Sequence, residues 1–251
     1  MLEATRTVRE FAIEIPSATR VFEALKIDYC CGGNRPLTEV CQQNGLELDE
    51  VLELLDEAKQ THLETQTQAA LPHAKADPQS MSLASLINLI VEKHHTYTRQ
   101  ELERLTALLE KVCTAHGTNH LELLDIRSQF QTLRAELEPH MLKEERILFP
   151  YITRLETAVG QKQPAPFAPF GEVANPIMVM TREHEAAGGI LITIRELSND
   201  FRTPDDGCFS YRTLYNELAA LEADLHQHIH LENNILFPRS LKMEQKAAGK
   251  M

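Results

Sequence analysis

An eleven-residue motif occurs twice in the chain and constrains its fold more than any other feature. Residues 140–150 and residues 228–238 both read His-x-x-x-Glu-x-x-Ile-Leu-Phe-Pro. Because residues four positions apart lie on one face of an α-helix, the imidazole and the carboxylate of each copy point the same way. The Ile-Leu-Phe-Pro ending alone would indicate only a repeated helix end. Two helices that each present a His-Glu pair indicate instead a polar site inside a helical core.

Histidines also occur in two further helical patterns. Apolar residues recur every three or four positions over most of the chain and β-branched alternation is scarce, so an all-α fold is expected. The long helices of an expected four-helix bundle span residues 82–115, 119–156, 176–199 and 211–242. His94 and His95 lie in the first helix and His184 in the third. A histidine near the middle of every helix is typical of a di-metal centre in a bundle core.

A shorter helical unit precedes the expected bundle. Ser17 is a favourable N-cap and predicts a helix as far as Leu25. Two more short helices are expected at residues 37–43 and 49–60. The next stretch contains two prolines and has no apolar period, which indicates a linker. The expected organisation is an N-terminal helical domain with a Cys-Cys motif at residues 1–61, a linker at 62–79 and the bundle at 80–245.

Charge and hydropathy exclude several classes of partner. The 251 residues include 37 acidic and 25 basic ones, a net charge of -12 that disfavours nucleic acid and anionic membrane surfaces. Apolar stretches such as residues 83–91 are far shorter than the roughly 20 residues of a spanning helix. The first ten residues lack the features of a secretory signal. Five cysteines, two of them adjacent, fit free thiols in a reducing cytoplasm, which is the expected localisation.

Position along the helices decides which histidines can share one site. His116 lies 21 residues after His95, about 31 Å along a continuous helix, whereas two metals in one site are roughly 3.5 to 4 Å apart. The neighbours His94 and His95 are rotated by about 100°, so only one should face inward, and spacing does not decide which. Spacing or an expected linker position also excludes His62, His73, His120, His226 and His230.

The donor types indicate which metal the site takes. Imidazole and carboxylate together suit iron better than calcium or magnesium, and the cluster contains no cysteine, which argues against structural zinc or an iron-sulfur cluster. Four terminal imidazoles and two bridging carboxylates would fill about eight of the twelve positions of two octahedral ions. An oxo or hydroxo bridge would fill two more. Open positions would then remain for a small ligand or for metal exchange.

Five segments of the chain together resemble one known family. They are residues 28–33 (Asp-Tyr-Cys-Cys-Gly-Gly), His95-x-x-x-Arg99, residues 183–188 (Glu-His-Glu-Ala-Ala-Gly) and the two copies of the motif. Over nearly its whole length the chain is similar to the Repair of Iron Centers proteins, bacterial di-iron proteins with a hemerythrin-like bundle that are implicated in restoring iron-sulfur clusters after nitrosative and oxidative stress. The resemblance implies that His95 is the ligand of its pair and that the motif glutamates bridge two irons. The ligand set it implies is His95, His140, Glu144, His184, His228 and Glu232.

One position separates this chain from the oxygen-carrying hemerythrins, which are similar in fold. Those proteins have a second histidine one turn after the third-helix ligand, where this chain has Gly188, followed by Gly189. The resemblance therefore implies a labile or reactive iron centre rather than a reversible oxygen carrier. Close helix packing is an equally good explanation of the two glycines.

Three functions remain open from the sequence. The first is supply of iron to damaged or apo iron-sulfur proteins, with Cys30 and Cys31 as redox thiols that handle thiol or nitric oxide chemistry on the N-terminal unit. The second is an enzyme that reduces nitric oxide or a related oxidant, and the third is a sensor of such gases. Nitric oxide or dioxygen would be the small ligand in each case, and a homodimer is an open alternative to a monomer. We expect at least one of the two thiols to be accessible to solvent and redox-active, because the start of the next helix favours a thiolate.

Overall fold

The structure is a computed structural model that describes residues 6–68 and 77–248. The described residues are helical and contain no β-strand, which confirms the expected all-α class. They divide into two compact units, one of residues 6–68 and 77–82 with 229–238 and one of residues 83–228 with 239–248. Within the described residues no helix combines the length and the apolar character needed to cross a membrane.

The first unit is built from short helices around its own apolar core. Its helices are α1 (Val8–Glu14), α2 (Ala18–Ala24), α3 (Leu37–Asn44) and α4 (Leu48–Gln68). Helix α1 starts with a capping box, in which Thr7 and Glu10 each accept a backbone N–H of the other. Helix α1 was not predicted from the sequence, although this Thr-x-x-Glu pattern is a recognised signal of a helix start. The core includes Phe11, Phe22 and Leu37, which are fully buried.

Two expectations for this unit need correction. Helix α4 continues to Gln68, so the stretch expected to be linker from residue 62 onward begins as helix. The reason is that Leu, Glu and Gln favour helix there and no proline interrupts them before residue 72. Ser17 precedes α2 but does not cap it, because its hydroxyl donates instead to the carbonyl of Ala58 at 2.8 Å. Residues 69–76, the middle of the expected linker, lie outside the described residues.

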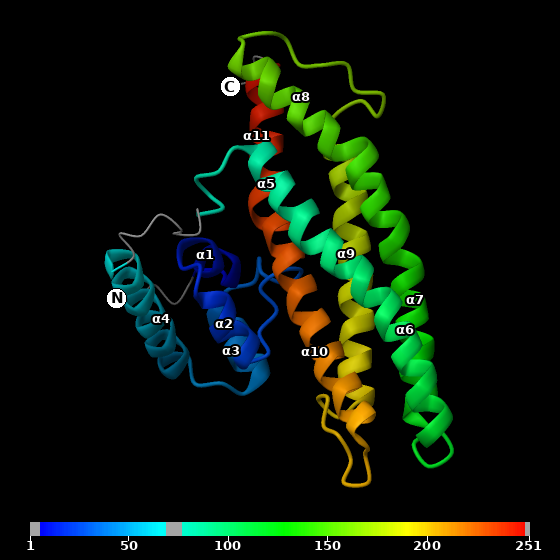
Figure 1. Cartoon of the computed structure of the whole chain (residues 1–251). Coiled ribbons are helices and arrows are strands. Elements are labelled where there is room, and N and C mark those ends of the chain that lie inside the picture. Colours follow the sequence, from blue (N-terminus) through cyan, green and yellow to red (C-terminus); the bar gives the residue numbers. More distant parts are fainter. Residues whose placement is uncertain (1–5, 69–76, 249–251) are drawn as a thin grey trace. The chain divides into compact units, whose positions relative to one another are not determined.

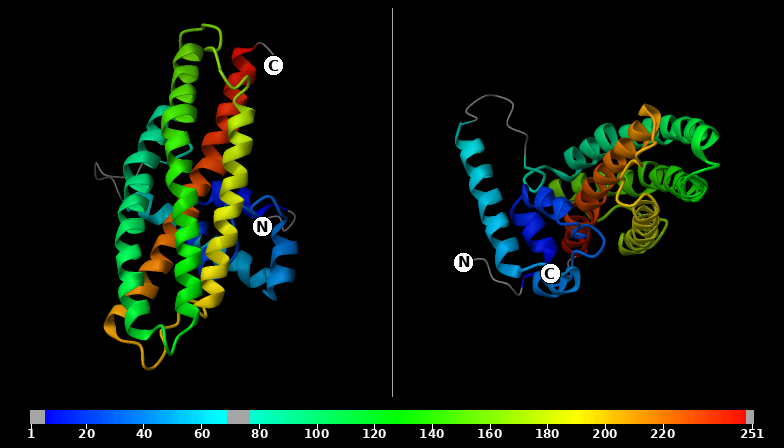
Figure 2. Two further views of the ribbon diagram at one scale, coloured as in Figure 1. Left: turned by 90° about the vertical axis from the view of Figure 1, so that its right-hand side faces the viewer. Right: turned by 90° about the horizontal axis from the view of Figure 1, so that it is seen from below.

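Four long helical rods form the bundle, as the sequence analysis expected (Figures 1 and 2). Three of them contain a π-helical segment, named η1 to η3. The first rod is α5 (Leu83–Leu89), η1 (Ile90–His95) and α6 (Thr96–His116), and the second is α7 (Glu122–Lys143), η2 (Glu144–Leu148) and α8 (Phe149–Gly160). The third is α9 (Ala174–Leu197), and the fourth is α10 (Phe209–His230), η3 (Leu231–Leu236) and α11 (Phe237–Ala247). Residues 229–238 of the fourth rod belong to the first unit.

Carboxylates from neighbouring rods accept hydrogen bonds from backbone N–H groups at the starts of two helices. Glu156 of α8 accepts the backbone N–H groups of Leu83 and Ala84 at 2.7 and 2.9 Å. Glu244 of α11 accepts the N–H of Val173, the residue before α9, at 3.0 Å. The first N–H groups of a helix have no partner within the helix, so these contacts cap α5 and α9 and fix how the rods align.

Gly189 gives a direct test of the packing explanation for the third-helix glycines. It lies inside α9, and a Cβ atom added there would meet nothing within 4 Å. Close packing therefore does not require a glycine at this position, and Gly189→Ala should raise the free energy of unfolding by about 0.5 to 1 kcal/mol. Urea unfolding followed by circular dichroism measures this. In the control Gly33→Ala the Cβ would lie 2.6 Å from the carbonyl oxygen of Tyr29, so this variant should lose stability. A loss at Gly189 as well would show that α9 needs that glycine.

Candidate metal centre

Three of the four rods change from α- to π-helical winding where the expected ligands lie. His95 ends η1, Glu144 begins η2 and Glu232 lies within η3. A π turn contains one extra residue and so shifts the side chains that follow it around the helix, and such turns are frequent at functional sites. The sequence predicted uninterrupted α-helix at these positions, because nothing in the motif distinguishes a π turn from an α turn.

All six expected ligands come together in the bundle. They form two groups whose donor atoms lie within 4.8 Å of one another: His95, Glu144, His228 and Glu232 in one, and His140, Glu144, His184 and Glu232 in the other. All six side chains are buried. Glu144 and Glu232 belong to both groups, and each group adds two histidines of its own. This is the pattern of two metal positions that share two carboxylates.

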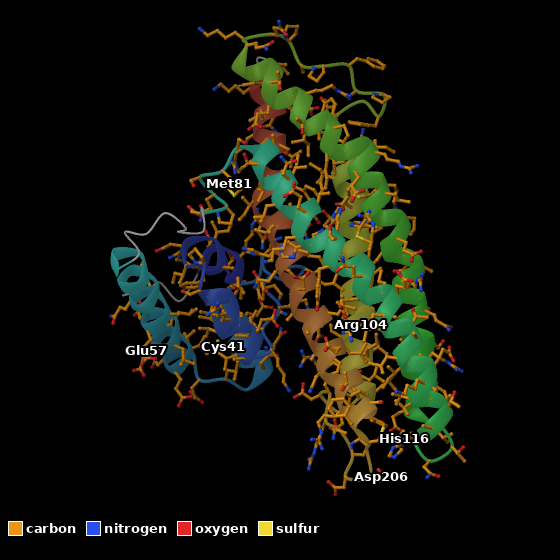
Figure 3. The ribbon with its side chains drawn as sticks, viewed as in Figure 1. Cys41, Glu57, Met81, Arg104, His116 and Asp206 are labelled. Carbon is orange, nitrogen blue, oxygen red and sulfur yellow. The ribbon has the colours of Figure 1, made fainter. Side chains whose placement is uncertain are left out.

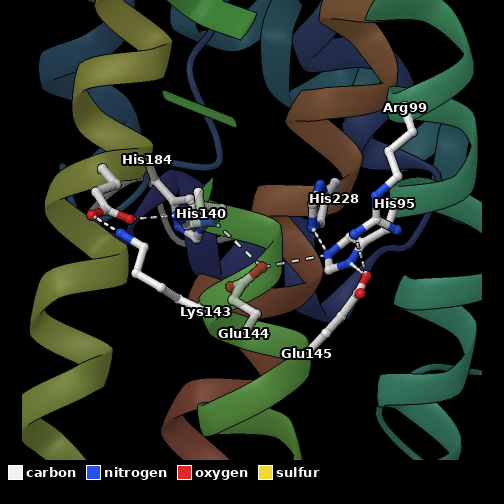
Figure 4. Close-up of polar contacts among 9 residues, drawn as sticks. His95, Arg99, His140, Lys143, Glu144, Glu145, His184 and His228 are labelled. Atoms are coloured by element: carbon white, nitrogen blue, oxygen red, sulfur yellow. Dashed lines mark hydrogen bonds and ion pairs between the residues drawn. The ribbon is translucent and has the colours of Figure 1, made fainter. Parts of the chain in front are cut away.

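The distances between donor atoms fit metal coordination. The Nε2 atoms of His95 and His228 are 3.0 Å apart, and those of His140 and His184 are 3.1 Å apart. Two imidazole nitrogens bound at about 2.1 Å in neighbouring octahedral positions would lie about 3.0 Å apart. Oε2 of Glu144 is 3.4 Å from Nε2 of both His95 and His140. Figure 4 shows this carboxylate between the two histidine pairs, with an interaction to each side.

His94 differs from its neighbour in what it contacts. Both histidines are buried, but only His95 belongs to a donor group. Nδ1 of His94 lies 3.0 Å from Asp224, and its ring stacks on that of His228 with centroids 5.8 Å apart. His94 belongs to neither donor group.

Two further carboxylates contact the Nδ1 atoms of two candidate histidine ligands. Glu145 accepts a hydrogen bond from Nδ1 of His95 at 2.7 Å, and Glu183 accepts one from Nδ1 of His140 at 2.8 Å. Burial alone would raise the pKa of each carboxyl, but the histidine and a cation, Arg99 for Glu145 and Lys143 for Glu183, hold both pKa values below the usual range. Sequence reasoning gave these two carboxylates no role, because contacts across 50 and 43 positions leave no local pattern.

The Cys-Cys motif forms a tight loop in the first unit. The carboxylate of Asp28 accepts the backbone N–H groups of Cys30, Cys31 and Gly32 at 3.0, 2.9 and 2.8 Å. Cys30 is buried and Cys31 is partly exposed, with their sulfur atoms 3.8 Å apart. The hydrogen bond to Cys31 and then burial raise the pKa of the Cys30 thiol well above its usual value. Of the two thiols, Cys31 is thus the accessible one, and its surroundings disfavour the thiolate of Cys30.

The second copy of the motif contacts this loop through its two variable asparagines. Nδ2 of Asn234 donates to the carbonyl oxygen of Tyr29 at 2.9 Å, and Nδ2 of Asn233 donates to that of Cys30 at 3.4 Å. The first copy has Glu145 and Arg146 at these positions. The two copies thus share their donor residues but differ at their variable positions. A variable residue binds a histidine in the first copy, and the variable residues bind the cysteine loop in the second.

His116 lies at the end of the bundle that also holds Asp206, away from the donor groups (Figure 3). Its Nε2 is 3.2 Å from Sγ of Cys208, which precedes α10 and is exposed. A backbone hydrogen bond from Tyr211 and the contact with His116 lower the pKa of the Cys208 thiol. Sequence reasoning gave Cys208 no role, because its partners come from outside the local sequence.

The order of thiol reactivity follows from these surroundings. At neutral pH we expect Cys208 to react with a thiol-labelling reagent several-fold faster than Cys30, because the thiolate is the reactive form and only Cys208 combines exposure with a lowered pKa. Mass spectrometry of briefly labelled native protein identifies the labelled residues. His116→Ala should slow labelling of Cys208 at neutral pH. Faster labelling of Cys30 than of Cys208 would show that the loop opens in solution.

Comparison with known proteins places both parts of the chain in described families. Residues 86–240 match the hemerythrin HHE cation binding domain, and residues 4–59 match ScdA_N, a domain of unknown function. A Haemophilus influenzae protein named "Probable iron-sulfur cluster repair protein" is 36% identical over 238 residues, 95% of this chain and 97% of the relative. "Iron-sulfur cluster repair protein YtfE" of Yersinia pseudotuberculosis is 34% identical over 233 residues, 93% of this chain and 95% of the relative.

These matches agree with the resemblance seen in the sequence, and they extend over both the cysteine loop and the donor groups. The similarity covers almost the full length of this chain and of its relatives. The hemerythrin match includes every residue of the two donor groups. The chain belongs to the Repair of Iron Centers family of iron-sulfur cluster repair proteins.

Proposed function

We propose that this chain holds two iron ions in its bundle and gives up iron to rebuild damaged iron-sulfur clusters. The observation that carries the proposal is the sharing of Glu144 and Glu232 by two groups of buried donors, each completed by two histidines. A single metal ion would not need two such groups. The names of the relatives, which describe cluster repair, support the same role.

The proposed division of labour among the residues follows their positions. His95 and His228 would hold one ion, His140 and His184 the other, and the two glutamates would bridge them. Iron bound in this way, with an oxo or hydroxo bridge, supplies a redox-active cation whose remaining positions accept incoming ligands. The bridging carboxylates offset the mutual repulsion of two cations at short distance. The four rods keep these donors in place and limit access of water, since all six side chains are buried.

The cysteine loop would act on the acceptor side of the transfer. Cys31 is partly exposed, and Cys30 lies beside it with its sulfur 3.8 Å away. Adjacent thiols are good ligands for iron once deprotonated. The partners proposed are iron-sulfur proteins that have lost iron from their clusters.

A transfer experiment tests this function. The chain is loaded with isotopically labelled iron and mixed with an iron-sulfur protein whose cluster lacks iron, in the presence of a chelator that captures free iron. We expect labelled iron to appear in the acceptor and its cluster absorbance to return. In the control, the same amount of labelled iron is added as a salt. The chelator should capture this iron, so none should reach the acceptor protein.

Two results would overturn the proposal. Labelled iron that stays on the chain or reaches only the chelator would exclude iron supply. Consumption of nitric oxide with a reductant, without any transfer of iron, would favour the enzyme instead.

A further inference from the structure

Each half of the candidate metal centre has one histidine with a carboxylate behind it. Glu145 contacts Nδ1 of His95, and Glu183 contacts Nδ1 of His140. An ionised carboxylate only accepts hydrogen bonds, so Nδ1 carries the proton in both rings. The opposite nitrogen, Nε2, therefore keeps its lone pair free for a metal ion, and it lies 3.4 Å from the shared carboxylate of Glu144 in both cases.

Each of these carboxylates also carries a cation on its outer side. Nη2 of Arg99 lies 2.8 Å from Glu145, and Nζ of Lys143 pairs with Glu183. The side chains of Arg99 and Lys143 are 40% and 39% exposed, whereas the two histidines are buried. Two parallel series thus lead from solvent to the metal centre, each in the order cation, carboxylate, imidazole; Figure 4 labels Arg99, Glu145 and His95 of the first.

The carboxylate and the cation act on the imidazole with opposite sign. A carboxylate that accepts the Nδ1 proton makes Nε2 a stronger donor to a metal and fixes the ring orientation. A cation beside that carboxylate draws off part of its negative charge, which weakens its pull on the proton. The net donor strength of His95 or His140 therefore depends on the balance within its own series.

We propose that Arg99–Glu145 and Lys143–Glu183 are positioning pairs that set how firmly each half of the centre holds iron. The carboxylate strengthens the histidine as a ligand, and the cation limits that strengthening so that iron remains transferable. This inference deepens the proposed function and rests on it for the identity of the metal.

Surface ion pairs offer the contrasting explanation. Most exposed ion pairs contribute little to stability and have no further role. Arg134 and Glu138, 2.8 Å apart on α7, form such a pair, and Glu138 belongs to neither donor group. Glu138→Gln is thus a matched control that removes the charge of a paired carboxylate on the same rod.

The test measures how fast the iron-loaded full chain releases iron to a chelator. Glu145→Gln should release iron about 10- to 100-fold faster than the parent chain, the usual size of such outer contacts. Arg99→Gln should release it more slowly, because Glu145 then acts on His95 undiminished. Glu138→Gln should match the parent. Glu183→Gln and Lys143→Gln repeat the comparison on the other half, in case one variant fails to fold.

The opposite signs are the decisive readout. If the carboxylate and cation variants of both series lose iron alike, or all match Glu138→Gln, the pairs are only structural and the inference is overturned. Titration with Co²⁺, read through its visible absorption, separates this outcome from failure of the proposed function. If the parent chain holds no iron, the function fails. Weaker Co²⁺ binding by Glu145→Gln together with tighter binding by Arg99→Gln would still support the positioning role, and any other order would refute it.

Discussion

Glu144→Ala should bind iron at least about tenfold more weakly than His184→Ala. Residues outside the first coordination sphere already contribute about 10- to 100-fold to metal affinity, so a ligand shared by two ions should exceed a ligand of one ion by at least the lower figure. Glu144 belongs to both donor groups, whereas His184 belongs to one. Loss of the shared carboxylate removes a donor from both positions and leaves two cations less screened from each other. Metal analysis of the purified variants, after equal loading and desalting, measures the difference.

Three companion variants make this result interpretable. Glu144→Gln keeps the size of the side chain and removes its charge, so it separates loss of bridging from loss of packing. Glu232→Ala should behave like Glu144→Ala, because Glu232 also belongs to both groups. His116→Ala should keep its metal, since His116 is outside both groups. Equal metal content in Glu144→Ala, Glu232→Ala and His184→Ala would contradict the bridging assignment.

Replacement of both Cys30 and Cys31 by serine should leave the iron content unchanged and lower iron transfer several-fold. Both cysteines lie with Asp28 in a separate group of possible donors, apart from the two groups that share Glu144 and Glu232, so the iron held by those two groups should stay. Serine keeps the backbone N–H groups that Asp28 accepts, so the loop should remain folded. The loss of transfer follows from the loss of the adjacent sulfur ligands. The labelled-iron experiment measures transfer, and metal analysis measures content.

The exposed thiol Cys208 supplies the matched control for the double variant. Cys208→Ser removes a thiol of lowered pKa without touching the loop, and it should transfer iron at the parent rate. Full transfer by the double variant, with both loop thiols labelled only after unfolding, would make the pair structural.

The sequence predicted the elements of the fold whose signals are local. Apolar periodicity was sufficient for the four rods, and the repeated motif placed four of the six donors. Helix α1 was also within reach, because Thr7 and Glu10 form a capping box. The π turns could not be predicted from the sequence, since their winding depends on packing among the rods and on the donors that meet there.

The site was predictable only as far as its donors. The family resemblance implied His95 in place of His94, and the structure puts His95 into a donor group. The roles of Glu145 and Glu183 could not be predicted, because each acts across a contact between rods that no spacing along the chain reveals. The raised pKa of Cys30 could not be predicted for a similar reason, since it depends on burial and on the position of the neighbouring sulfur.

Metal analysis of the parent chain, purified from cells grown with ample iron, tests most directly whether the two donor groups form a di-iron centre. We expect about two irons per chain, because two groups of donors share two carboxylates in the manner of di-metal bundles. Stoichiometric zinc without iron, or a single iron per chain after full loading, would contradict it.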